Sequence, residues 1–97
     1  MRLDITMAAK QDLKSIARHT QQHWGLEQRN ASLREIDQVL RGLASNPMLG
    51  RACDDILAGY RKLPHRRHVI YYTSTPTLVR IIRVLHARMD AHAQTGV

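Results

Sequence analysis

Several features are scarce or missing in this chain of 97 residues, and each absence excludes a class of protein. There is a single cysteine, Cys53, so no disulfide can form within the chain, which fits a reducing compartment. No apolar run is long enough to cross a membrane. Residues 1–10 also lack the apolar core of a secretory signal, so we expect a cytoplasmic protein with no membrane contact.

The side chains that enzymes use for covalent or metal chemistry do not form a recognisable group. The five glycines are scattered, so they make no phosphate-binding loop, and no nucleophile–base constellation stands out. His19 and His23 have the spacing that lets a helix present two imidazoles to one metal ion, but no third ligand is evident. We interpret this pair as solvent-facing, Cys53 as a small packing residue and Asp54-Asp55 as loop or helix-cap chemistry. The sequence therefore predicts no catalytic residue, no cofactor and no metal.

Positive charge is in excess. Fifteen lysines and arginines face eight acidic residues, which gives a net charge of +7 on a small body. Twelve of the fifteen are arginine, the residue favoured where flat, bidentate contacts are made. Such a field predicts an acidic partner, which could be nucleic acid, an acidic protein or an anionic surface. Charge alone does not choose among these three.

Hydrophobic periodicity predicts one strand and two helices in the first half of the chain. Apolar and polar residues alternate from Leu3 to Met7, the period of a half-buried strand. Apolar residues then recur at helical spacing from Leu13 to Trp24, and Gly25 ends this helix. A second amphipathic helix runs over about 26–44 and stops before Pro47. The short break between them predicts an antiparallel helix hairpin.

The second half is strand-rich. Residues 48–55 are typical of a loop, and three strands are expected over 59–63, 68–73 and 78–85, with turns between them. These turns are short enough for antiparallel hairpins. The predicted order is strand, helix, helix and a three-stranded antiparallel meander, which makes residues 1–97 a single α+β domain of two layers.

Basic side chains gather on the predicted meander, where neighbouring strands would join them into one positive region. They are Arg61, Lys62, Arg66, Arg67, His68, Arg80, Arg83, His86 and Arg88. Such a region could stabilise the phosphate charge of an RNA undergoing cleavage, or dock an acidic protein surface. The plain alternative is that many of these side chains are simply solvated.

Two positions within the meander stand out. Arg83 lies between Ile82 and Val84, so its guanidinium either pairs internally or lines a groove. Tyr71 and Tyr72 must point to opposite faces of their strand. We expect one of them to pack in the core with its hydroxyl at the rim, and the other to be available for a partner.

Short motifs, in a fixed order along nearly the whole chain, resemble those of ParE toxins. They are Ala9-Lys10-Gln11-Asp12-Leu13, His23-Trp24-Gly25 with Glu27-Gln28, Asn46-Pro47 with Gly50, Ile56 to Arg61 ending in Gly59-Tyr60-Arg61, His68-Val69-Ile70-Tyr71-Tyr72, Ile81-Ile82-Arg83-Val84-Leu85-His86 and Arg88-Met89-Asp90. The family belongs to the RelE/ParE superfamily and has the same strand–helix–helix–meander order.

The resemblance implies a toxin of a type II toxin–antitoxin system, neutralised by a ParD-like antitoxin and directed at DNA gyrase. Ribosome-dependent RNA cleavage, the activity of the RelE branch, is the alternative. Arg61, Lys62 and Arg88 can be placed on positions that branch uses. However, His68 stands about where an arginine would be expected, and no tyrosine follows Tyr72.

We therefore expect gyrase inhibition with no catalysis by the toxin itself. The residues expected to contact antitoxin or gyrase are Arg61, Lys62, Tyr71, Arg80, Arg83, His86 and Arg88. A plain nucleic-acid-binding domain, suggested only by charge, is the third possibility. It is the weakest of the three because nothing resembles a recognition helix, so no sequence-specific DNA binding is expected.

Overall fold

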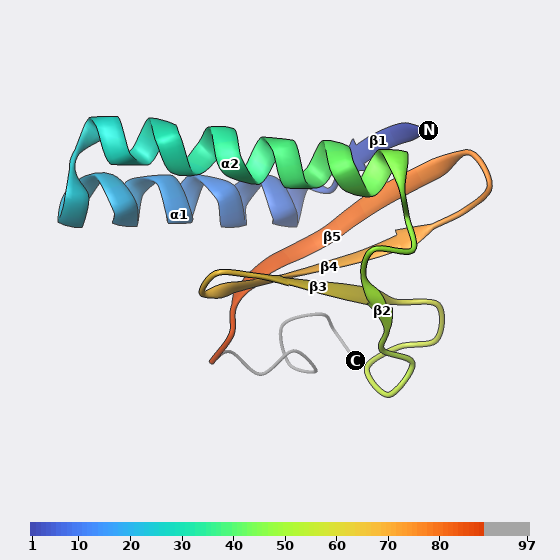
Figure 1. Cartoon of the computed structure of the whole chain (residues 1–97). Coiled ribbons are helices and arrows are strands. Elements are labelled where there is room, and N and C mark those ends of the chain that lie inside the picture. The colour runs from blue at the N-terminus through green and yellow to red at the C-terminus, as the bar shows by residue number, and fades with distance from the viewer. Residues whose placement is uncertain (89–97) are drawn as a thin grey trace.

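Two helices cover one face of a five-stranded sheet in the computed structural model, which describes residues 1–88 (Figure 1). In chain order the elements are β1 (Arg2–Ile5), α1 (Met7–Trp24), α2 (Leu26–Ser45), β2 (Arg51–Ala52), β3 (Arg61–His65), β4 (His68–Ser74) and β5 (Leu78–His86). The strand order is β1-β5-β4-β3-β2, with β1 parallel to β5 and the other pairs antiparallel. The predicted α+β class, with an N-terminal strand, a helix hairpin and an antiparallel meander, is confirmed.

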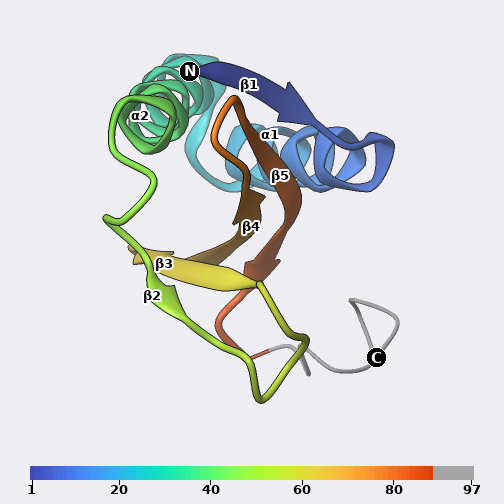
Figure 2. The same cartoon turned by 90° about the vertical axis from the view of Figure 1, so that its right-hand side faces the viewer.

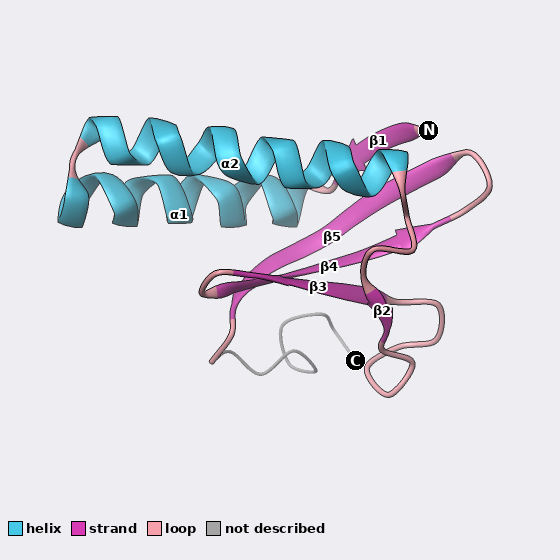
Figure 3. Cartoon of the chain, viewed as in Figure 1, coloured by secondary structure: helices cyan, strands magenta, loops and turns pink. Residues whose placement is uncertain are grey.

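The views along and across the helices show how the layers meet. The helices lie side by side above the sheet, so that one layer is helical and the other consists of strands (Figure 3). Seen from the end of the helices, the sheet curls away from β1 through β5 and β4 to β3 and β2 (Figure 2). No helix within residues 1–88 is both long and apolar enough to cross a bilayer.

The first predicted strand ends earlier than its alternation suggests. Met7 is not its last inward residue: it begins α1 and is 71% exposed. Thr6 is the reason, because its side chain accepts a hydrogen bond from the Ala9 N–H at 3.1 Å and so caps the helix. The alternation of apolar residues continues by chance into the first turn of the helix.

The helix hairpin is confirmed, with one error in its predicted apolar face. Gly25 separates the helices at a φ of 92°, a conformation that side chains other than glycine rarely adopt. Ile36, Leu40 and Leu43 of α2 are buried as their spacing predicts. Trp24 is instead 68% exposed, because the hairpin end of the two helices extends past the sheet (Figure 1).

The meander also differs in detail from the prediction. The segment expected to be a loop contains β2, a short strand that pairs with Arg61 and Lys62. The turn after β3 is reduced to Arg66 and Arg67, so Pro64 lies inside the strand. Since β2 does not reach Pro64, that side of β3 has no neighbour there, and the missing N–H breaks no ladder bond.

Two apolar clusters hold the sheet from its two faces. The larger lies under the helices and includes Ile70, Tyr72, Val79, Ile81 and Val84. The smaller lies on the opposite face; it consists of Cys53, Ile56, Tyr71 and Leu85, with Tyr60 and Val69 packed against them. Cys53 is therefore a buried packing residue, and burial raises the pKa of its thiol.

Tyr72 ties the end of α2 to the sheet. Its hydroxyl donates to the Pro47 carbonyl at 2.6 Å and accepts from the Gly50 N–H at 2.8 Å. A Cβ at Gly50 would lie 2.5 Å from that hydroxyl oxygen and 2.7 Å from the Lys62 carbonyl oxygen, so only glycine fits. The tyrosine therefore fixes the route of the chain from α2 into β2.

Replacing Tyr72 with phenylalanine tests this role. Tyr72→Phe leaves a buried N–H and a carbonyl without a partner, and we expect a loss of about 1–3 kcal/mol in the free energy of unfolding. Urea unfolding followed by circular dichroism measures it. Tyr60→Phe is the matched control, since the Tyr60 hydroxyl has no hydrogen bond within residues 1–88. Equal stability of the two variants would contradict the assigned role.

Candidate functional site

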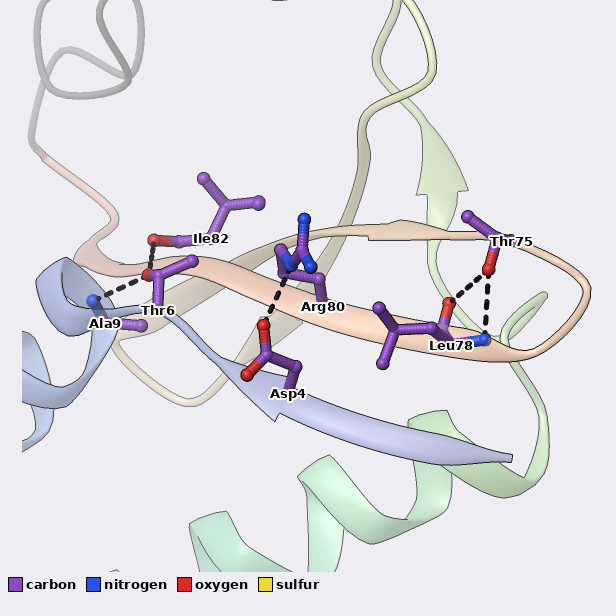
Figure 4. A network of polar contacts seen from close by, with 7 residues as sticks. All are labelled: Asp4, Thr6, Ala9, Thr75, Leu78, Arg80 and Ile82. Atoms are coloured by element: carbon purple, nitrogen blue, oxygen red, sulfur yellow. Dashed lines mark hydrogen bonds and ion pairs between the residues drawn. The ribbon is translucent and has the colours of Figure 1, made fainter.

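The edge of β5 is closed by residues of α1 where β1 stops. The parallel pairing of β1 with β5 ends at Ile5 and Ile81, and Thr6 makes the next hydrogen bonds to β5 (Figure 4). The Thr6 N–H donates to the Ile81 carbonyl at 3.1 Å, and its hydroxyl donates to the Ile82 carbonyl at 2.8 Å. One step further, Asp12 Oδ2 accepts the Val84 N–H at 3.0 Å. The start of α1 is thereby fastened to the strand beside it.

Asp12 also holds Arg83. The two side chains form a bidentate pair, with Nε–Oδ2 at 2.7 Å and Nη2–Oδ1 at 2.8 Å. They are only 20% and 14% exposed, so solvent screens the pair less than a surface salt bridge. The hydrogen bond to Asp12 raises the pKa of the Arg83 guanidinium above its usual value. Of the two predicted roles for Arg83, internal pairing is the one observed.

The seven residues expected to meet a partner do not form one region. Lys62, Tyr71 and Arg83 are direct neighbours across β3, β4 and β5. Tyr71 in this row is 7% exposed and packs in the smaller apolar cluster. The expectation that one of the two tyrosines stays open for a partner is therefore wrong, because both are buried.

Arg61 and Arg80 are engaged elsewhere. The Arg61 guanidinium donates to the Gly50 carbonyl through Nε at 3.0 Å and Nη2 at 2.6 Å. Arg80 pairs with Asp4 across the β1–β5 seam at 2.8 Å, where both side chains are half-exposed (Figure 4). Arg61 thus links β3 to the residue before β2, and Arg80 links β5 to β1.

His86 and Arg88 lie at the other end of the sheet. Residue His86 faces His68, which in turn pairs with His65. At about 3.3 Å per residue, His65 is about 13 Å along β3 from Arg61. Arg61 and Arg80 thus lie toward one end of the strands, and His65, His68 and His86 lie toward the other. Arg88 is exposed, and its N–H donates to His86 Nδ1 at 3.2 Å.

A groove opens at this second end, between the helix hairpin and the β3–β4 turn. Three adjoining depressions meet at His68, and we call them together the hairpin groove. They are lined by Asp12, Ser15, Ile16, His19, Thr20, Trp24, Gln28, Ser32, Glu35, Ile36, His65, Arg66, Arg67, His68, Val84 and His86. The central depression has a volume of about 420 Å³. Its lining residues His19, Trp24 and Gln28 belong to the hairpin end of α1 and α2, and this end extends past the sheet (Figure 1).

One side of the hairpin groove is neutralised by Glu35. Its carboxylate accepts hydrogen bonds from the Arg66 guanidinium and also lies 3.1 Å from His65 Nε2. The hydrogen bond from Arg66, with the charges of Arg66 and His65, lowers the pKa of Glu35 despite the opposing effect of burial. The helix α2 is linked in this way to the β3–β4 turn.

No acidic side chain within residues 1–88 forms an ion pair with His68. Its ring meets that of His86 edge-on, with centroids 5.8 Å apart. Burial lowers the pKa of His68 below its usual value, and the charges of His86, His65 and His19 lower it further. The sequence showed these histidines only as scattered positions, because four different elements bring them together. No three histidine, cysteine or acidic side chains within residues 1–88 are arranged to hold a metal ion.

The low pKa of His68 makes folding stability depend on pH. Between its usual pKa of 6.5 and the lowered value in the fold, the unfolded chain binds a proton that the folded chain does not. Stability is therefore lost as pH falls through this window. We expect His68→Gln to lose less stability than the native chain between about pH 7.5 and pH 5.5. Urea unfolding at both pH values measures the difference, with His23→Gln as an exposed control; equal losses in all three proteins would contradict the account.

Comparison with known proteins gives the family. Residues 3–91 match the model of the ParE toxin of the parDE type II toxin–antitoxin system. A relative named Toxin ParE1 from Mycobacterium tuberculosis is 40% identical over 87 residues, which is 89% of each chain. Toxin ParE1 from Caulobacter vibrioides is 36% identical over 92 residues, or 95% of each.

A solved structure shares the fold. It belongs to the chromosomal ParDE toxin–antitoxin system of P. aeruginosa, with a TM-score of 0.77 and 20% identity. The match covers 89% of this chain and 95% of that one. The order of strand, helix hairpin and antiparallel strands, the motifs spread along the chain and the match to residues 3–91 agree. This chain belongs to the ParE toxin family of type II toxin–antitoxin systems.

Proposed function

We propose that this chain acts in the cytoplasm as a single-domain toxin over residues 1–97, neutralised by a ParD-like antitoxin, and that it inhibits DNA gyrase without catalysis of its own. The observation that carries the proposal is the family match over residues 3–91. The relatives in M. tuberculosis and C. vibrioides are named as ParE toxins, and the structural neighbour comes from a ParDE system.

The surface of the chain supports capture by an acidic, partly apolar antitoxin segment. The hairpin groove has apolar side chains in its lining, beside Arg66, Arg67 and four histidines. A net charge of +7 favours an acidic partner over a basic one. The exposed Trp24 and Leu26 at the hairpin tip offer apolar contacts that a wrapped partner would bury.

The state of the arginines disfavours an RNA-cleaving enzyme. Arg61 is bound to the Gly50 carbonyl, and Arg83 is held by Asp12. Neither guanidinium is poised to meet a phosphate undergoing cleavage, which preorganised charge stabilisation requires. No tyrosine follows Tyr72 in the sequence to serve as the C-terminal aromatic group of that branch.

The seven expected contact residues now divide by role. We propose Lys62, His86 and Arg88 as residues that touch antitoxin or gyrase directly, since Arg88 is exposed and Lys62 and His86 are partly exposed. Arg61, Tyr71, Arg80 and Arg83 would support that surface from within the fold, through their contacts with Gly50, Cys53, Asp4 and Asp12.

A supercoiling and cleavage assay on purified gyrase tests the proposal. Refolded toxin should reduce supercoiling and accumulate cleaved DNA, and equimolar antitoxin should reverse both effects. Lys62→Ala and Arg88→Ala should weaken inhibition by graded amounts, about threefold to tenfold each, as at other protein interfaces. Lys14→Ala, an exposed lysine on α1, is the matched control.

The opposite result is also informative. Full gyrase activity at saturating toxin, together with cleavage of messenger RNA in translating ribosomes, would replace the proposal by the RelE-type alternative. In that case Arg88→Ala should abolish cleavage outright instead of weakening it by degrees.

A further inference from the structure

The central depression of the hairpin groove has an unusual set of side chains. It is lined by His19, Thr20, Trp24, Gln28, Ser32, Arg67, His68 and His86. Every polar member can donate a hydrogen bond, and none is a carboxylate. The nearby Glu35 and Asp12 are already occupied, by Arg66 and Arg83 respectively. Within residues 1–88, this depression is therefore a concave surface rich in hydrogen-bond donors and lined by no carboxylate.

Arg67 is the strongest of these donors. Its side chain makes no hydrogen bond or ion pair within residues 1–88, unlike Arg61, Arg66, Arg80 and Arg83. Its carbonyl accepts the Ala87 N–H at 2.9 Å, which holds the β3–β4 turn against the end of β5. The backbone of Arg67 is thus held in place, while its guanidinium has no partner within residues 1–88. An exposed, anchored arginine of this kind suits a bidentate contact with an oxyanion.

The imidazoles beside Arg67 repel one another when charged. His68 is approached by His86 from β5, His65 from β3 and His19 from α1, with Arg66 and Arg67 in the turn. The two acids that face this group, Glu35 of α2 and Asp12 of α1, are each shared with an arginine. An anion among the rings would relieve the repulsion and favour their protonation. Its binding would therefore strengthen as pH falls.

Trp24 adds a second kind of contact. The indole lines the same depression and is 68% exposed, so a large flat apolar ring stands open at the rim. A positive groove with an accessible aromatic face is the combination by which single nucleotides and unpaired strands are held. The volume of about 420 Å³ is within the range of small-ligand sites. A bare phosphate would leave most of this space, and the indole, unused.

We propose that the hairpin groove binds a nucleotide unit, with its phosphate between Arg67, His68 and His86 and its base against Trp24. The unit is either a free nucleotide or part of a single strand, since both present the same phosphate and base. The site does not depend on gyrase inhibition or on the antitoxin. Loss of either of those functions would leave it standing.

Fluorescence gives a direct test because Trp24 is the only tryptophan in the chain. Folded toxin is titrated with adenosine monophosphate, inorganic phosphate, adenosine and a short single-stranded oligonucleotide. We expect saturable quenching by the monophosphate, weaker effects from phosphate or adenosine alone, and tighter binding near pH 6 than near pH 8. A strand that binds more tightly than the monophosphate identifies nucleic acid as the source; equal affinity per nucleotide identifies the free ligand.

Matched charge variants separate a site from general attraction. Arg67→Gln should weaken binding about tenfold, the loss expected for one charge-assisted contact. Arg51→Gln removes the same charge from exposed strand β2 and should leave affinity unchanged. Circular dichroism verifies that each variant is folded, and the histidine proton resonances provide a second readout at His68. Equal weakening by the two variants, or no saturable change with either the monophosphate or the strand, would overturn the proposal.

Discussion

The strand β5 depends on a helix to complete one of its edges, and much of the molecule follows from this. Strand β1 covers that edge only as far as Ile81. Beyond it, Thr6 and Asp12 supply the missing partners for the Ile82 carbonyl and the Val84 N–H. Because a buried backbone group without a partner is costly, these contacts hold α1 at a set height over the sheet. The overhang that forms the hairpin groove is the geometric result.

In this arrangement, some basic side chains are paired within the fold and others keep donors open to a partner. Arginines on the sheet are committed to structure: Arg61 to a carbonyl, Arg80 and Arg83 to carboxylates. In the hairpin groove, the Arg67 side chain makes no hydrogen bond or ion pair within residues 1–88, and His19, His68 and His86 line the same depression. A net charge of +7 therefore describes the long-range field, while the open donors determine where an acidic partner or ligand can be held. Both ends of β3 carry basic residues, but Arg61 is bound within the sheet and His65 lines the hairpin groove.

The sequence predicts the layers better than the site. Periodic apolar residues such as Ile36, Leu40 and Leu43 find the helices, because one face must be buried whatever lies opposite. Trp24 was misplaced since periodicity does not tell where a helix outruns its sheet. The role of Arg83 depends on Asp12, which is 71 residues away in the chain, and no local pattern contains that contact. Strand register likewise separates Arg61, which lies opposite Tyr72, from His86, which lies opposite His68.

Amide hydrogen exchange at Val84 reports whether Asp12 closes the edge of β5. In the native chain the Val84 N–H should be protected nearly as well as that of Ile70, which lies opposite on β4. Asp12→Ala should accelerate exchange at Val84 by about tenfold or more while Ile70 stays protected, since only the acceptor on the helix is lost. Unchanged protection at Val84, or equal acceleration at both amides, would contradict the account.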